Sequence, residues 1–119
     1  MIMLHQEHQK DKGPVTEGRT KYSRQELLSE IGKEGQQKIC NAKIAIVGIG
    51  ALGTVCAELL ARAGVGKLLL IDRDVVEETN LQRQMLFDER DLGRSKSQTA
   101  RERLQRINST ITISAETIH

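Results

Sequence analysis

Residues 43–74 read KIAIVGIGALGTVCAELLARAGVGKLLLIDRD, and this stretch decides the fold. The apolar run 44–47 predicts a strand that ends at a glycine cluster. A helical pattern follows over 54–63, and the apolar run 68–71 predicts a second strand that ends at Asp72. Strand, tight turn, helix, strand and acid in this order are typical of a mononucleotide-binding βαβ unit.

The three glycines of the turn have separate mechanical roles. Gly48 lets the chain turn sharply, Gly50 leaves room for a phosphate near the backbone, and Gly53 lets the helix pack close to the sheet. The helix N-terminus then offers unpaired N–H groups to an anion, and Asp72 can accept hydrogen bonds from ribose hydroxyls. A purely structural turn has similar glycines, so the complete βαβ context is what predicts nucleotide binding.

Composition limits the function classes. The 119 residues are enough for one modest domain, and a net charge of +2 with 2% aromatic residues does not favour a nucleic-acid partner. The sequence has no apolar run of membrane-spanning length and no signal-peptide core, so we expect a cytoplasmic protein without a membrane partner. Cys40 and Cys56 are too far apart for a CxxC pair, and no metal-binding residue is assigned.

The N-terminal part divides into a tail and a helical entry. Residues 1–20 are polar and contain the only proline, which predicts a disordered tail or an extended arm, while the ordered domain is expected over 21–119. Ser23 and Glu26 fit a capping box that opens a helical segment ending near Cys40. We expect its buried face to hold Leu27, Leu28 and Ile31.

The central and C-terminal elements predict the first half of a doubly wound sheet. The stripe that packs the central helix on the sheet is expected to hold Val55, Leu59 and either Leu60 or Ala63. Ser95 and Gln98 predict the start of a second helix over 96–107, whose buried stripe would hold Ala100, Leu104 and Ile107. The alternation in 110–115 predicts a further strand. A half sheet of this kind leaves an exposed edge, which favours a fragment or a chain completed by a partner.

The polar segment after Asp72 emerges at the carboxyl end of a strand, where open α/β sheets bind their ligands. Its basic residues therefore have a reason to lie near phosphates, although a solvated loop explains each of them equally well. They are Arg83, Arg90, Arg94 and Lys96.

Five motifs in order extend this interpretation. They are YSRQ at 22–25, IVGIGALG at 46–53, AGVGKLLLIDRD at 63–74, NLQRQ at 80–84 and GRSK at 93–96, followed by a helix that ends RIN at 106–108. With these motifs the chain resembles the N-terminal part of the ThiF/MoeB/HesA family, which is related to ubiquitin-activating enzymes. The resemblance covers about residues 21–119 and implies a Rossmann-like, mostly parallel sheet with a helical entry.

The resemblance also implies a chemistry. Members of the family bind ATP with Mg²⁺ and adenylate the C-terminal Gly-Gly carboxylate of a small ubiquitin-like or sulfur-carrier protein, and many form homodimers. Family members are longer, and their magnesium-binding aspartate lies beyond the matched part. We therefore expect an incomplete portion of an activating enzyme.

Site roles follow from the resemblance position by position. Gly48, Gly50 and Gly53 would cradle the nucleotide and Asp72 would hold the ribose. Asn80, Arg83 and Lys96 would reach the phosphates, and Gln84 lies in the same motif with a less defined part. Arg24 matches an arginine that crosses to the triphosphate of the neighbouring subunit, so Arg24, Arg83 and Lys96 are the candidate catalytic residues.

Two other functions remain open. The glycine fingerprint with Asp72 alone favours an NAD-binding oxidoreductase domain. A non-catalytic nucleotide-binding or dimerisation module is the third candidate. NLQRQ and GRSK distinguish the first from these, because a dinucleotide site does not need a triphosphate clamp after the second strand.

Overall fold

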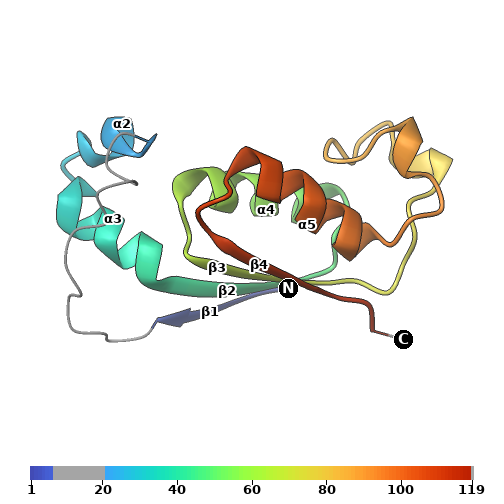
Figure 1. The fold of residues 1–119 in the computed structure, drawn as a ribbon, viewed down its shortest axis with the longest axis horizontal. Helices are drawn as coiled ribbons and strands as arrows, with labels where there is room; N and C mark the ends of the chain where they lie inside the picture. Colours follow the sequence, from blue (N-terminus) through green and yellow to red (C-terminus); the bar gives the residue numbers. More distant parts are fainter. Residues whose placement is uncertain (7–20, 119) are drawn as a thin grey trace.

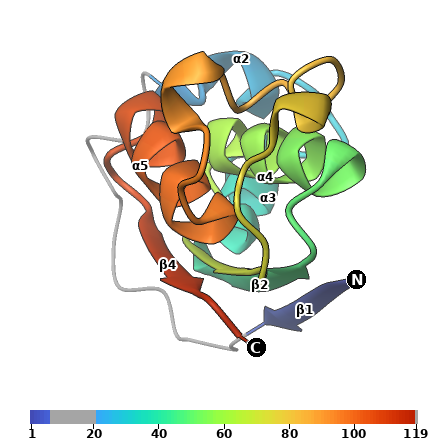
Figure 2. The same ribbon diagram turned by 90° about the vertical axis from the view of Figure 1, so that its right-hand side faces the viewer.

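In a computed structural model, which describes residues 1–6 and 21–118, the chain forms one sheet with two long helices on one of its faces (Figures 1 and 2). The elements in chain order are β1 (Ile2–Gln6), α2 (Ser23–Glu26), α3 (Gly32–Asn41), β2 (Ala42–Val47), α4 (Ala51–Ala63), β3 (Lys67–Ile71), the short 3₁₀ helices η1 (Glu78–Asn80) and η2 (Glu89–Asp91), α5 (Lys96–Ile107) and β4 (Thr112–Glu116).

The sheet has the strand order β1-β2-β3-β4. Strands β2, β3 and β4 are parallel, with Ile46 opposite Leu70 and Leu70 opposite Ala115, whereas β1 pairs antiparallel with β2. Helices α4 and α5 follow β2 and the segment after β3, as crossover connections between parallel strands require. The predicted Rossmann-like, mostly parallel sheet in its first half is confirmed.

The edge strand β1 shows that part of the tail is extended, which is one of the two alternatives expected from its composition. Residues 2–6 pair in register with β2, and the ladder ends where the Met1 ammonium donates to the Val47 carbonyl at 2.8 Å. The reason is that β2 presents a free row of backbone donors and acceptors, which any extended segment can satisfy without a side-chain pattern. Residues 7–20 lie outside the described part of the chain.

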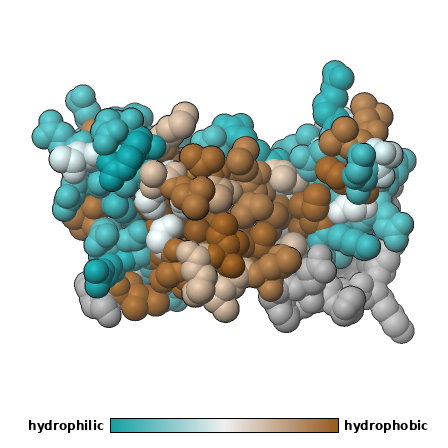
Figure 3. Space-filling model, turned by 180° about the vertical axis from the view of Figure 1, so that it is seen from behind, coloured by the Kyte–Doolittle hydropathy of each residue, from teal (hydrophilic) through white to brown (hydrophobic). Residues whose placement is uncertain are grey.

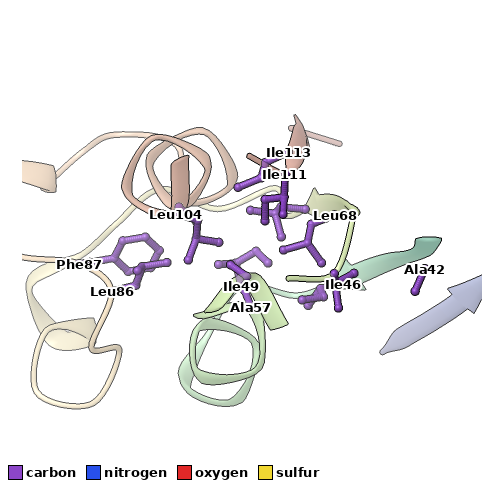
Figure 4. Packing of buried hydrophobic residues seen from close by; sticks show 14 of the residues in the cluster. Ala42, Ile46, Ile49, Ala57, Leu68, Leu86, Phe87, Leu104, Ile111 and Ile113 are labelled. Carbon is purple, nitrogen blue, oxygen red and sulfur yellow. The ribbon is translucent and has the colours of Figure 1, made fainter. Parts of the chain in front are cut away.

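The core lies between the sheet and the two helices. Leu68 and Leu70 face the helices and are almost fully buried, and Leu104 of α5 packs against them (Figure 4). Ala100 and Leu104 are fully buried and Ile107 is partly buried, so the predicted stripe of α5 is confirmed. The predicted Ser95 cap is present, because its hydroxyl accepts from the Gln98 amide at 3.4 Å.

The buried face predicted for α4 is wrong at Val55 and Leu59, whereas Leu60 is partly buried against the core. Thr54, Ala57 and Ala61 face the core, whereas Val55 and Leu59 are 40% and 61% exposed. Apolar residues surround α4, so their periodicity does not single out one face, and the close approach to the sheet selects the small side chains. Seen from behind, the molecule has a broad apolar area in its middle (Figure 3).

The helical entry also differs from the prediction. Helix α2 has Tyr22 at its N-cap with no side-chain capping bond, and it ends at Glu26. Leu27 and Leu28 are therefore not on a helical face, and they are 78% and 55% exposed. Helix α3 begins at Gly32, whose φ of +59° suits glycine, and it ends beside Cys40 as expected.

Candidate functional site

The turn after β2 has the strict glycine requirements that its sequence predicts. Gly48 has a φ of +96° and its amide donates to the Ile71 carbonyl at 2.8 Å, which ties the ends of β2 and β3 together. A Cβ on Gly53 would lie 1.9 Å from the Gly48 carbonyl oxygen. Helix α4 can therefore start directly over the sheet only because residue 53 lacks a side chain.

Gly50 is different, because neither its backbone nor its packing excludes a side chain. It is the N-cap of α4 with a φ of −102°, and the nearest atom to a Cβ there would be Gln84 Nε2 at 3.8 Å. No side chain caps this helix start. The amide groups of the first turn of α4 are thus left for another acceptor, with Gln84 beside them.

Asp72 directly follows β3 and contacts the turn. One carboxylate oxygen accepts from the Ile49 amide at 2.6 Å, and the other accepts from the Asp74 amide at 2.7 Å. These bonds fix the carboxylate beside the glycine turn. A carboxylate oxygen can accept more than one bond, so Asp72 keeps acceptor capacity for ligand hydroxyls.

The segment after Asp72 folds back on itself and returns to α5. Val75 and Ser95 form an antiparallel bridge, and the Lys96 amide donates to the Asp74 carbonyl at 3.0 Å. Asn80 is buried and its Oδ1 accepts from the Glu77 amide at 2.8 Å, which shapes η1. The Asn80 oxygen is therefore structural, and its amide nitrogen is the group available to a ligand.

The structure distinguishes the basic residues that have carboxylate partners from those that do not, which the sequence could not do. Arg90 binds Asp88 of the same loop at 2.7 Å and Arg94 binds Glu102 of α5 at 2.6 Å, so both already have a carboxylate partner. Arg83 is exposed and makes one bond, to the Thr79 carbonyl at 3.0 Å. Lys96 is only 7% exposed, and none of the described residues provides an acceptor for its ammonium group.

Arg103 is a structural residue that the sequence analysis missed. Its guanidinium binds Asp88 at 3.0 Å, Asp91 at 2.8 Å and the Leu86 carbonyl at 3.3 Å, and so attaches the loop to α5. Asp91 is 1% exposed and its other oxygen lies 3.5 Å from Arg94. No spacing in the sequence marks these partners, because the loop brings them together.

These ion pairs set the titration of the loop. The Arg90 guanidinium beside Asp88 holds the pKa of that carboxyl well below its usual range, and Arg103 acts in the same direction. Arg94 lowers the pKa of Glu102, and the carboxylates raise the pKa of Arg90 and Arg94 in return. The loop therefore keeps its charges paired at neutral pH.

A pH dependence of stability follows from these pKa directions. The unfolded values are about 3.9 for Asp and 4.3 for Glu, and the folded values are lower, so the unfolded chain binds more protons in between. Stability should be fully present above about pH 5 and should fall as the pH drops below about 4. Asp88→Asn should make urea midpoints fall less between these values than in the wild type. Glu30→Gln is the control for loss of an exposed carboxyl, and an unchanged slope for Asp88→Asn would contradict the role of the loop.

Gln84 is a buried polar side chain without a complete set of partners. It is 3% exposed, and its Oε1 has no hydrogen-bond partner among the described residues. Buried polar atoms are rarely left unpaired without a functional reason. The amide nitrogen of the same side chain, rather than this oxygen, is the atom that lies beside Gly50.

Arg24 lies far from these residues. It is exposed on α2, which docks at the C-terminal end of α4 through Gln25 and the Ala63 carbonyl. The glycine turn is at the other end of this helix, whose 13 residues span about 20 Å. Figure 1 shows α2 at the opposite end of the molecule from η1 and η2. Arg24 is therefore separated from the glycine turn of its own chain.

The contacts thus bring the glycine turn, Asp72 and Gln84 together, and the loop that holds Asn80, Arg83 and Lys96 leaves the same edge of the sheet. The described residues hold no group of three or more His, Cys, Asp or Glu side chains that could bind a metal ion. No described helix is long and apolar enough to cross a membrane.

Comparisons with known proteins agree with the motifs. A model described as the ThiF family matches residues 22–118. The sulfur carrier protein ThiS adenylyltransferase of Bacillus subtilis (strain 168) is 50% identical over 95 residues, which are 78% of this chain and 28% of that protein. The adenylyltransferase and sulfurtransferase MOCS3 of Mus musculus is 48% identical over 91 residues, which are 76% of this chain and 20% of that protein.

Solved structures give the same result. E. coli tRNA N6-threonylcarbamoyladenosine dehydratase, TcdA, in complex with ATP aligns with a TM-score of 0.79 and 33% identity, over 84% of this chain and 40% of that one. E. coli MccB with ATP aligns with a TM-score of 0.76 and 36% identity, over 83% of this chain and 30% of that one. The predicted resemblance is confirmed, and the chain spans less than half of each of these proteins.

Proposed function

Because the chain belongs to the ThiF family, we propose that it is the ATP-binding part of an enzyme that adenylates a small carrier protein. The acceptor is the C-terminal carboxylate of a ubiquitin-like or sulfur-carrier protein that ends in Gly-Gly. The enzyme acts as a homodimer in the cytoplasm. Relatives named as ThiS adenylyltransferases support the reaction class, and neighbours crystallised with ATP or AMP support the nucleotide.

The observation that carries this proposal is Lys96, whose side chain is largely buried and whose ammonium group has no ion pair among the described residues. A fixed ammonium group that no protein carboxylate neutralises can bind a phosphate as a point charge. Lys96 is the first residue of α5, where a positive charge is also unfavourable to the helix dipole. A phosphate chain that runs from the N-terminus of α4 towards Lys96 would neutralise it.

The proposed chemistry needs position and charge rather than a general base. The ionised carboxylate of the carrier attacks the α-phosphorus of ATP, a new P–O bond forms, and the bond to the β-phosphate oxygen breaks to release pyrophosphate. Lys96, Arg83 and the α4 amides stabilise the charge that collects on the leaving group. The Gly48–Gly53 turn cradles the nucleotide, Asp72 accepts from the ribose hydroxyls, and Asn80 and Gln84 donate amide N–H groups.

The described residues do not form a complete metal site from their own side chains. The carboxylates near the turn are engaged by backbone amides or arginines, and no group of three or more metal-binding side chains is present there. We infer that a carboxylate from outside the matched region completes the Mg²⁺ site together with the phosphates of ATP.

Arg24 acts on the neighbouring subunit in this proposal. Its guanidinium is exposed, has no ion pair within the described part of the chain, and is separated from its own glycine turn by the length of α4. A planar guanidinium can hold two phosphate oxygens at once. A second copy of the chain would receive it at its triphosphate.

ATP–pyrophosphate exchange tests the reaction. We expect exchange of labelled pyrophosphate into ATP when the full-length enzyme that contains this chain is mixed with a Gly-Gly carrier protein such as ThiS and Mg²⁺, and none when the carrier lacks its two terminal glycines. ATP binding without exchange would instead support a non-catalytic nucleotide-binding module. Neither exchange nor ATP binding would contradict the proposed function altogether.

A further inference from the structure

Arg24 stands between two side chains that are inserted into the end of another helix. Tyr22 precedes it by two residues and is 4% exposed, and Gln25 follows it directly and is half-buried. Both contact the last turn of α4, whose final carbonyls have no partner within the helix. The guanidinium between them is free of partners within the described residues.

Tyr22 is held by both shape and hydrogen bonds. Its ring occupies the space that a side chain on Gly64 would fill, since a Cβ there would lie 2.5 Å from the ring carbon Cζ. The amide of Asn108 donates to the Tyr22 hydroxyl at 2.7 Å and to the Ala61 carbonyl at 2.8 Å. Asn108 is 1% exposed, so it joins α2, the end of α4 and the end of α5 at one point.

Gln25 makes a second, independent attachment. Its Nε2 donates to the Ala63 carbonyl at 2.7 Å and to Oε1 of Gln36 at 2.5 Å. Gln36 is 4% exposed and its own amide donates to the same Ala63 carbonyl at 3.1 Å. A four-residue helix has little stability of its own, so these bonds determine where α2 lies.

We propose that Tyr22 and Gln25 are positioning residues that hold Arg24 in place for the active site of a second copy of this chain. The inference rests on the proposed function, in which Arg24 reaches the triphosphate of its neighbour. When the backbone that carries a long side chain is already fixed, less conformational entropy is lost as that side chain binds its ligand. Helix α4 then carries a phosphate-binding turn at its first residue and, at its last, the support of the arginine that acts on the partner's site.

A double-mutant cycle on ATP affinity tests this role. ATP is titrated into the wild type, Gln25→Ala, Arg24→Ala and the double variant by calorimetry, at concentrations where sedimentation shows a dimer. We expect Gln25→Ala and Arg24→Ala each to weaken ATP binding about fivefold, and the double variant to be no more than twofold weaker than Arg24→Ala. Gln25→Glu, which cannot donate to the Ala63 carbonyl, should weaken ATP binding as much as Gln25→Ala. Tyr22→Phe should also weaken ATP binding in the wild type and should have little further effect in the Arg24→Ala variant.

Hydrogen exchange over residues 22–26 shows whether the attachment is lost, and Gln37→Ala on the neighbouring helix is the matched control. Faster exchange in Gln25→Ala with unchanged ATP affinity would overturn the positioning role. So would a loss of ATP affinity from Gln25→Ala that is the same in the wild type and in the Arg24→Ala variant. A chain that stays monomeric at every concentration would overturn it as well. An Arg24→Ala variant with wild-type ATP affinity would contradict the positioning inference but not the proposed ATP-binding function. A wild-type chain that does not bind ATP would contradict both.

Discussion

Lys96→Met is expected to make the chain more stable and to remove most of its ATP affinity. Methionine keeps the length of the buried stem and removes an ammonium group that has no acceptor among the described residues and lies at the start of α5. Removing a cation from the start of α5 should stabilise the fold by about 0.5 kcal/mol, or roughly 2 °C in Tm. Losing a charge-assisted bond to phosphate, worth about 1.5–3 kcal/mol, should weaken ATP binding roughly 10-fold to 150-fold.

Thermal unfolding and calorimetry measure the two effects on one sample. Arg90→Met is the matched control, because Arg90 belongs to the same loop but is neutralised by Asp88. Arg90→Met should leave the ATP affinity within about twofold of the wild-type value, since a surface ion pair contributes little energy. A Lys96→Met variant that is less stable and binds ATP normally would mean that the lysine supports the fold and not a ligand.

Gly53→Ala is expected to unfold the chain or to destabilise it severely. The added Cβ would lie 1.9 Å from the backbone oxygen of Gly48, and a backbone atom in a tight turn cannot move aside as a side chain can. Relief requires α4 to lift from the sheet, at a loss on the order of 3–5 kcal/mol. That loss is a large part of the total stability of a small domain.

The other turn glycines give graded controls for this prediction. Gly48→Ala meets no atom within 4 Å but has a φ of +96°, so it should lose only about 1–2 kcal/mol. Gly50→Ala should lose no more than about 1 kcal/mol, because alanine is a poorer N-cap than glycine, and should lose ATP affinity, because its Cβ would occupy the approach to the α4 amides. Urea midpoints rank the three variants. A stable, folded Gly53→Ala chain would contradict the close contact between α4 and the turn.

The sequence predicts the part of the fold in which local pattern and tertiary packing agree. The apolar runs around Ile46 and Leu70 and the stripe of Ala100 and Leu104 have the spacing of their elements, and each is found as expected. Helix α4 has apolar residues on all sides, so its spacing left the buried face undecided. Strand β1 forms through backbone pairing, which the side-chain pattern does not record.

The candidate site also contains residues that the sequence predicts and residues that only the folded structure identifies. The glycine turn and Asp72 follow from spacing alone, because their roles depend on the backbone within one βαβ unit. Arg90, Arg94 and Lys96 are equivalent in the sequence, and only the folded loop neutralises the first two while leaving the third without a partner. The attachment of Tyr22 to Asn108 joins residues 86 positions apart, which no local motif indicates.

Titration of the wild-type chain with ATP and with NAD tests the central claim most directly. Both ligands can place a phosphate at the α4 N-terminus and a ribose at Asp72, so the comparison isolates the contribution of the cations that follow β3. Saturable ATP binding, with NAD binding no better than background, is the expected result. Tighter binding of NAD, with ATP at background, would contradict the account and would assign the turn to a dinucleotide.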